Sequence, residues 1–137
     1  IAVGPSLQIA AKQTIDATGM IIAPGFINPH THMQPWLTSD EEQIVSMQQF
    51  IDSSSATTAD FFHLEGRGHL RPGAFADLVI FDPEAYSALA TYERPDVAAT
   101  GVRTVIVNGQ IAVDHGKVTG VASGRALRHQ PPAGTCN

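Results

Sequence analysis

The chain has 137 residues, of which 43% are hydrophobic and 15% charged, and its formal net charge is −5. This composition is typical of a globular domain that is large enough to bury a core, and it excludes a disordered segment. No cluster of Lys and Arg is present that could follow a phosphate backbone. Because the overall acidity would repel nucleic acid and anionic lipid, the expected partners are small molecules or proteins.

Cysteine usage fits a reducing compartment, and hydropathy bears on membrane spans and signal peptides. The single cysteine, Cys136, cannot form a disulfide within the chain, which fits the cytoplasm. No apolar run approaches the length of a membrane span, and no signal-peptide pattern is visible. The sequence begins at Ile1 and not at Met, which leaves open a fragment or a processed product.

The first part of the chain is predicted to form short strands separated by turns. The expected strands are residues 7–11, 14–17 and 20–23. Pro24-Gly25 then ends this pattern. A further extended segment begins at Phe26 and runs into two histidines.

These two histidines, His30 and His32, are the first candidate site. Residues two apart on a strand point to the same face, so both imidazoles can bind one metal ion from a rigid element. The alternative is that both are surface or hydrogen-bonded histidines without a metal, which is the more common situation for two nearby histidines. The motif alone leaves both interpretations open.

A helix is expected next. Ser39-Asp40-Glu41-Glu42 has the form of a capping box, and apolar residues at helical spacing follow it. We therefore predict a helix from Asp40 to about Ile51, a break or loop over residues 53–58, and a short helical turn over 59–64.

The second half is predicted to be β-structure. Residues 77–82 contain a continuous apolar run, which is typical of a strand buried on both faces. Residues 105–107 and 111–113 flank Asn108-Gly109, and this dipeptide favours a tight hairpin turn because both positions tolerate positive φ. A second turn is expected at His115-Gly116, and residues 129–137 are expected to form a flexible tail.

Two stretches carry a family resemblance. Residues 15–32, Ile-Asp-Ala-Thr-Gly-Met-Ile-Ile-Ala-Pro-Gly-Phe-Ile-Asn-Pro-His-Thr-His, resemble the opening segment of the amidohydrolase superfamily. Residues 66–83, with Pro72-Gly73 and Ala-Asp-Leu-Val-Ile-Phe-Asp-Pro, resemble the segment that returns from its barrel to its β-sandwich. Residues 91–95, 101–109 and 119–127 look like the N-acyl-D-amino-acid deacylase branch. The resemblance implies that His30 and His32 ligate zinc and that the substrate is a small N-acyl amino acid.

The space between the two matching stretches is too short for a barrel. The resemblance as a whole covers residues 1–32 and roughly 60–128, so only residues 33–59 lie between its two parts, whereas a (β/α)8 barrel needs at least about 200 residues. The family's other metal ligands and its catalytic Asp lie on later barrel strands without a counterpart here. Asp40 is a weak candidate for that acid, and a capped helix start explains it more simply.

The predicted fold is therefore mainly β: a composite β-sandwich domain over residues 1–128 with one or two helices and no complete barrel. Within it, residues 1–32 provide N-terminal strands and a remnant of the first barrel strand, 33–64 a helical connection, and 65–128 the C-terminal strands. A sandwich that lacks edge strands could pair with a second copy of the chain, which predicts a possible homo-oligomer.

Other polar residues receive structural interpretations. His63 could cover the core, while His69, His115 and His129 are expected in solvated turns or in the tail. Asp77 is expected to accept hydrogen bonds from turn amides. The two arginines expected to pair with carboxylates or carbonyls are Arg67 and Arg125.

Three functional interpretations remain open. The chain is a non-catalytic β-sandwich remnant of a zinc-dependent amidohydrolase, or its metal site is completed by another chain or an omitted segment, or the middle of an ordinary hydrolase is missing from this sequence. A catalytic zinc normally has three protein ligands, so His30 and His32 alone cannot build the site.

Overall fold

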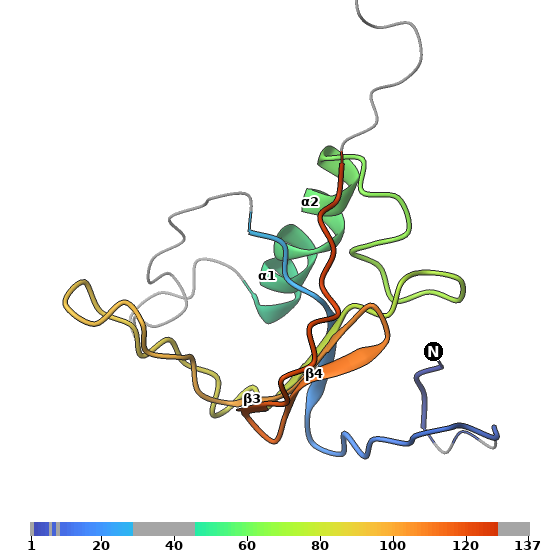
Figure 1. The fold of residues 1–137 in the computed structure, drawn as a ribbon, viewed down its shortest axis with the longest axis horizontal. Coiled ribbons are helices and arrows are strands. Elements are labelled where there is room, and N and C mark those ends of the chain that lie inside the picture. Colours follow the sequence, from blue (N-terminus) through green and yellow to red (C-terminus); the bar gives the residue numbers. More distant parts are fainter. Residues whose placement is uncertain (1, 6, 8, 29–45, 129–137) are drawn as a thin grey trace, which may run out of the picture.

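The computed structural model describes residues 2–5, 7, 9–28 and 46–128. Their strands form one antiparallel sheet of five strands, in which each strand neighbours the next one along the chain. Two short helices lie beside it (Figure 1). The elements are β1 (Ile21–Pro24), α1 (Met47–Ser54), α2 (Ala56–Phe61), β2 (Leu78–Phe81), β3 (Val102–Val107), β4 (Gln110–Asp114) and β5 (Lys117–Val118).

The prediction of a mainly β fold without a barrel is confirmed for the described residues. All described strands belong to a single sheet, so the second sheet of a sandwich stays a prediction. Neither helix in this part of the chain is long and apolar enough to cross a membrane.

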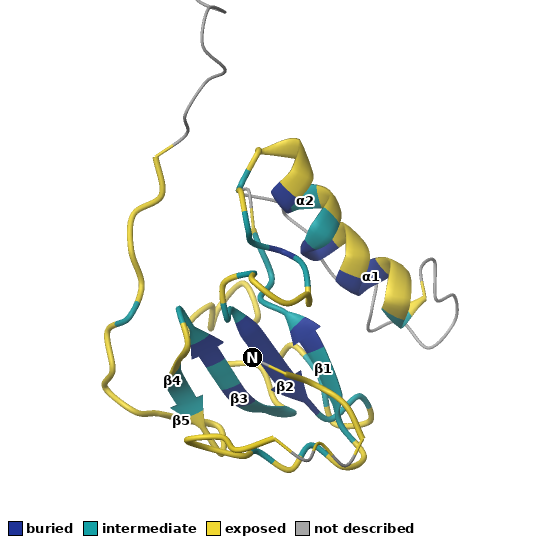
Figure 2. Cartoon of the chain, turned by 90° about the vertical axis from the view of Figure 1, so that its right-hand side faces the viewer, coloured by how far each residue is buried: buried dark blue, intermediate teal, exposed yellow. Residues whose placement is uncertain are grey.

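Strand β2 is an inner strand of the sheet, and all four of its residues are buried. It pairs with β1 on one side and β3 on the other. Because side chains alternate along a strand, Val79 and Phe81 face one side of the sheet. They pack there in one cluster with Phe50 and Ile51 of α1, and Figure 2 shows the helix pair beside the edge formed by β1. The predicted strand at 77–82, buried on both faces, is confirmed.

The predicted helix boundaries are wrong. Helix α1 begins at Met47, where Ser46 and Gln49 form a capping box: Gln49 N donates to Ser46 Oγ at 3.2 Å, and Ser46 N donates to Gln49 Oε1 at 2.8 Å. Since Ser46 has extended backbone angles, no helix runs unbroken from Asp40 to Ile51. The capping box proposed at residues 39–42 lies outside the described residues.

The break predicted over residues 53–58 is present but much shorter, because Ser55, with a φ of −131° and a ψ of −82°, is the one residue that separates two helices. Helix α1 continues to Ser54, and α2 begins at Ala56. The serines and threonines of this stretch bond back to helix carbonyls, because Ser55 Oγ donates to Ile51 O at 2.5 Å and Thr58 Oγ1 donates to Ser53 O at 2.6 Å. Such local bonds let polar side chains sit in a helix that bends, although the same residue types usually favour turns.

The predicted hairpins are confirmed. Asn108 and Gly109 have φ values of 48° and 79° between β3 and β4, and His115 and Gly116 have values of 47° and 72° between β4 and β5. Two successive residues with positive φ match the right-handed twist of antiparallel strands. The three strands therefore form a meander with short connections.

Of the three strands predicted near the N-terminus, only the last is present, as β1. The described residues of 7–11 and 14–17 are in no strand, and most of them are exposed. An alternating sequence pattern forms a strand only where a partner strand can pair with it, and no described strand pairs with these residues.

The outer edge of β1 offers few groups for further pairing. Gly25 N donates to Asp77 O at 2.8 Å, so the alternation of antiparallel bonding directs the N–H and C=O groups of Ile22 and the C=O of Pro24 away from β2. Pro24 has no N–H. An edge with a single outward N–H is a poor template for a second chain, and the predicted pairing of copies finds little support at β1.

A local turn near the N-terminus lowers the pKa of Asp16. The side-chain hydroxyl of Thr18 donates to Asp16 Oδ1 at 2.7 Å and its backbone N–H donates at 2.9 Å, and these bonds hold the pKa of Asp16 below its usual value of 3.8. We expect Thr18→Val to raise the Asp16 pKa, measured by NMR titration of the carboxyl carbon, and Thr18→Ser to leave it low. The folded turn favours the carboxylate, so its contribution is present above the unfolded pKa and is lost as pH falls through the folded one. An unchanged midpoint in Thr18→Val would contradict this cause.

Candidate metal-binding segment and its supporting polar network

The predicted site residues His30, His32 and Asp40 lie outside the described residues. The structure shows the chain that leads toward the two histidines. After β1, Gly25 N donates to Asp77 O, and Ile27 N donates to Ser54 O at 2.7 Å. The segment therefore leaves the sheet and crosses to the C-terminal end of α1.

Phe26 anchors this crossing. Its ring lies edge-on to Phe50 of α1, with centroids 5.2 Å apart, and to Phe81 of β2 at 6.1 Å. The phenylalanine thus fills the space between helix and sheet, while the backbone on either side of it is hydrogen-bonded to a different element. The segment up to Asn28 is held by packing and by main-chain bonds together.

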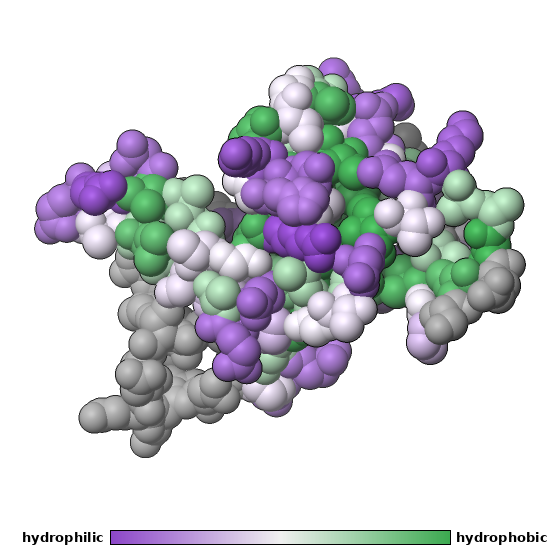
Figure 3. Space-filling model, turned by 90° about the horizontal axis from the view of Figure 1, so that it is seen from below, coloured by the Kyte–Doolittle hydropathy of each residue, from purple (hydrophilic) through white to green (hydrophobic). Residues whose placement is uncertain are grey.

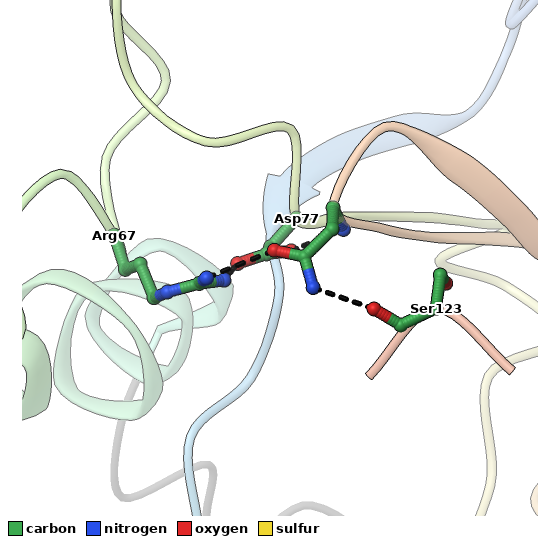
Figure 4. A network of polar contacts seen from close by, with 4 residues as sticks. Arg67, Asp77 and Ser123 are labelled. Atoms are coloured by element: carbon green, nitrogen blue, oxygen red, sulfur yellow. Dashed lines mark hydrogen bonds and ion pairs between the residues drawn. The ribbon is translucent and has the colours of Figure 1, made fainter. Parts of the chain in front are cut away.

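A polar network lies beside this crossing (Figure 4). Arg67 pairs through Nη1 with Asp77 Oδ2, and its Nη2 donates to Asn108 Oδ1 at 2.8 Å. The backbone N–H of Asn108 donates to Asp77 Oδ1 at 2.7 Å, and its Nδ2 donates to Ser123 O at 2.6 Å. Four segments that are distant in sequence are tied together in this way.

The network is largely shielded from water. The side chains of Arg67 and Asp77 are 13% and 19% exposed, and the Arg67 guanidinium lies over the ring of Phe75 at 4.2 Å. A planar guanidinium can bond two acceptors and stack on a ring at once, which an ammonium cannot do. The structural roles predicted for Asp77 and Arg67 are confirmed, whereas Arg125 forms no ion pair or hydrogen bond with the described residues.

The other histidines do not gather into a metal site. His69 Nε2 lies 2.9 Å from Asp60 Oδ1, and His115 Nδ1 lies 2.9 Å from Asp114 Oδ1. His115 is 72% exposed, as predicted for a solvated turn, while His69 is 31% exposed and joins its loop to α2. His63 follows α2 with a φ of 53°. Within residues 2–28 and 46–128, no three His, Cys, Asp or Glu side chains lie close enough to hold a metal ion.

A shallow hollow of about 230 Å³ lies between the N-terminal segment and the turn at residues 70–76. Its lining is mostly apolar, including Val3, Phe75 and Leu78, with His69 and Arg71 as the charged or titratable groups. The face of the molecule drawn in Figure 3 carries apolar and polar residues side by side. The hollow has no carboxylate in its lining and carries no acid–base pair.

The Amidohydrolase family matches residues 36–113, which is more than half of the chain. The chain belongs to the amidohydrolase family. The match includes both helices, β2, β3 and most of β4.

Similar proteins place the chain near the D-aminoacylases. It is 46% identical over 70 residues to a D-aminoacylase from Alcaligenes xylosoxydans xylosoxydans, a match that covers 51% of this chain and 14% of that protein. It is 34% identical over 101 residues to an N-acyl-D-aspartate deacylase of the same organism, covering 68% and 20%. A crystal structure of D-aminoacylase superposes with a TM-score of 0.52 at 40% identity, over 54% of this chain and 16% of that one.

This amidohydrolase chain therefore spans between about a seventh and a fifth of the length of its curated relatives. The predicted resemblance to a D-aminoacylase-like amidohydrolase is confirmed. Another solved D-aminoacylase, with a TM-score of 0.52, was studied for the role of its binuclear metal center. Metal dependence is thus a property of the relatives.

One functional group of the network was not predicted. The sequence indicates Asn108 as a turn residue, but its side chain also joins Arg67 to the C-terminal segment. The partner lies 41 residues away in sequence, and no local pattern links the two. The only available signal is that Asn, and not Gly, occupies the first turn position.

Proposed function

We propose that these residues are the non-barrel part of a zinc-dependent amidohydrolase that hydrolyses N-acyl-D-amino acids, and that the 137-residue chain alone is not catalytic. The observation that carries this proposal is the structural match to a D-aminoacylase of known structure, which covers 54% of this chain at 40% identity. Support for the substrate class comes from relatives that are a D-aminoacylase and an N-acyl-D-aspartate deacylase.

The described residues do not fit a catalytic zinc site by themselves. Such a site uses three protein ligands and an open position, and the described part of the chain contains no group of three suitable side chains. His30 and His32 are the proposed ligands, and they provide two of the three. We therefore assign no catalytic step to residues of this chain, and Asp40 remains only a weak candidate for the acid.

The second candidate is an active enzyme whose site is completed by another chain or by a segment absent from this sequence. The observation that favours it is the firm support of the segment before His30: Gly25 and Ile27 are bonded to two different elements, and Phe26 is packed between them. A fixed approach of this kind is what a preorganised metal ligand needs.

Metal content separates these functions. We expect the purified chain, dialysed against a mild chelator, to retain far less than one zinc per chain, and to release no amine from N-acetyl-D-amino acids. The reason is that two imidazoles without a third ligand bind zinc weakly, and more weakly as they protonate at lower pH. Elemental analysis and an amine-release assay measure the two properties.

A double variant, His30→Ala with His32→Ala, is the control for the ligands. Weak zinc binding that disappears in the variant would support the two histidines as ligands. Near-stoichiometric zinc that survives dialysis and disappears in the variant would contradict the inactive form and support a site completed between chains. Zinc binding that is unchanged in the variant would rule out His30 and His32.

A further inference from the structure

Asn108 combines a reactive sequence with a constrained setting. It is followed by Gly109, and the backbone nitrogen of a glycine can approach a preceding asparagine side chain without steric hindrance. Among the described residues the other asparagine is Asn28, which precedes Pro29. Because proline has no N–H, Asn108 is the described asparagine that can react with its following residue.

The reaction is a deamidation. The nitrogen of Gly109 bonds to Cγ of Asn108, the Cγ–Nδ2 bond breaks, and ammonia leaves with a proton from the attacking nitrogen. Water then opens the resulting cyclic imide, so that residue 108 becomes aspartate or isoaspartate. One water is consumed and one ammonia is released, and no other reactant is needed.

In the folded structure, the backbone N–H of Gly109 and both polar atoms of the Asn108 amide are held by hydrogen bonds that the reaction must break. The nucleophile, Gly109 N–H, donates to Ala76 O at 2.9 Å. On the amide, Oδ1 accepts from Arg67 and Nδ2 donates to Ser123 O. Cyclisation requires the side chain to turn toward Gly109, which breaks these bonds. The network therefore restrains the amide for as long as the hairpin stays closed.

We propose that Asn108 is a latent deamidation site, guarded by the Arg67 network, whose conversion to aspartate releases the C-terminal segment from the sheet. In this proposal the amide is the part of the side chain that matters. Its Nδ2 is the donor that holds Ser123 O, and a carboxylate has no donor to replace it.

The change in charge acts in the same direction. A carboxylate at position 108 would place two like charges around one guanidinium, since Asp77 Oδ2 already pairs with Arg67 and Asp77 Oδ1 accepts from the backbone of residue 108. It would also set an anionic oxygen against the Ser123 carbonyl. Repulsion between like charges in a shielded site favours separation. The backbone N–H of Thr119 stays bonded to Ala112 O of β4, so the part to be released is residues 121–128, which are mostly exposed.

The guard is tested by incubating the chain in mildly alkaline buffer, folded and in urea, and following residue 108 by peptide mass mapping. We expect slower conversion in the folded chain by at least about tenfold, because opening breaks several hydrogen bonds. Arg67→Lys should speed conversion in the folded chain, since Lys has a single terminal nitrogen in place of the two, Nη1 and Nη2, with which Arg67 reaches Asp77 and Asn108 separately. Equal conversion rates in folded and unfolded chains would contradict the proposal that the Arg67 network protects Asn108.

The release is tested by brief native trypsin digestion at Arg125. We expect Asn108→Asp to be cut several-fold faster than wild type. Asn108→Gly, which keeps the turn but lacks the amide, should also be cut faster. The matched control is Gln110→Glu, which adds the same charge to an exposed position of the same hairpin and should behave as wild type. If Asn108→Asp and wild type are cut equally fast while both keep the same circular dichroism spectrum, the proposed release is wrong.

Discussion

Replacing Phe81 with alanine is expected to lower the free energy of unfolding by about 3 to 5 kcal/mol, the usual cost of removing a buried phenylalanine. The side chain is fully buried, with 0% exposure. Its ring contacts Phe26 at 6.1 Å and Tyr86 at 4.8 Å between centroids, and it shares a cluster with residues of α1. The truncation would leave a cavity where sheet, helix and crossing segment meet. Urea unfolding measured by circular dichroism gives the free energy.

The control for Phe81→Ala is Val118→Ala on β5. Val118 is 82% exposed, so its truncation should change the free energy of unfolding by no more than about 0.5 kcal/mol, as is usual for surface substitutions. A loss of similar size in both variants would mean that Phe81 is not the centre of the core. Burial in that core also raises the pKa of Tyr86.

The second large effect is expected for Gly101→Ala, with a loss of roughly 2 to 5 kcal/mol from left-handed strain and steric overlap together. Gly101 has a φ of 77°, and a Cβ atom there would lie 2.5 Å from Tyr86 N and 2.6 Å from Ala85 C. These are backbone atoms, so no side-chain rotation relieves the overlap. Gly101 O also accepts from Asp82 N at 2.9 Å, which ties the end of β2 to the start of β3. Thermal and urea unfolding measure the loss.

Gly73→Ala separates the two causes. Gly73 has a φ of 86°, but a Cβ atom at this position would meet no atom within 4 Å beyond its chain neighbours. Alanine there meets only the cost of the left-handed backbone, about 1 to 2 kcal/mol. We expect Gly101→Ala to be the more damaging variant. Equal losses would show that the steric overlap at Gly101 contributes nothing.

The parts of the fold that could be predicted are those specified by neighbouring residues. The continuous apolar run of β2 predicts burial on both faces of the strand. The Asn108-Gly109 pair predicts a tight turn with positive φ at both residues. The strands predicted at 7–11 and 14–17 depend on a partner strand, which no local pattern can supply. The predicted helix starts at Asp40 with Ser39 as its cap, although Ser46 with Gln49 forms an equivalent capping box closer to the buried Phe50 and Ile51.

The candidate site was predictable only in part. His30 and His32 follow from their spacing and from the resemblance around them, and they lie outside the described residues. The polar network differs: structural roles were expected for Arg67 and Asp77, but that they bond to each other and that Arg67 also bonds to Asn108 is visible only in the folded chain. Long-range pairing between polar residues produces no periodic pattern in the sequence. The sequence therefore predicts what kind of group each residue bonds to, but not which residue it is.

The sheet pairs β1 directly with β2, so that Pro24 lies opposite Leu78 and all of the chain between them forms one closed loop. The entropy lost in closing such a loop rises only with the logarithm of its length, by about 0.6 kcal/mol for each doubling. Lengthening this connection several-fold would therefore cost the sheet little, as long as the added chain folds on its own. The free energy of forming the β1–β2 pairing is therefore nearly independent of how many residues lie between the two strands.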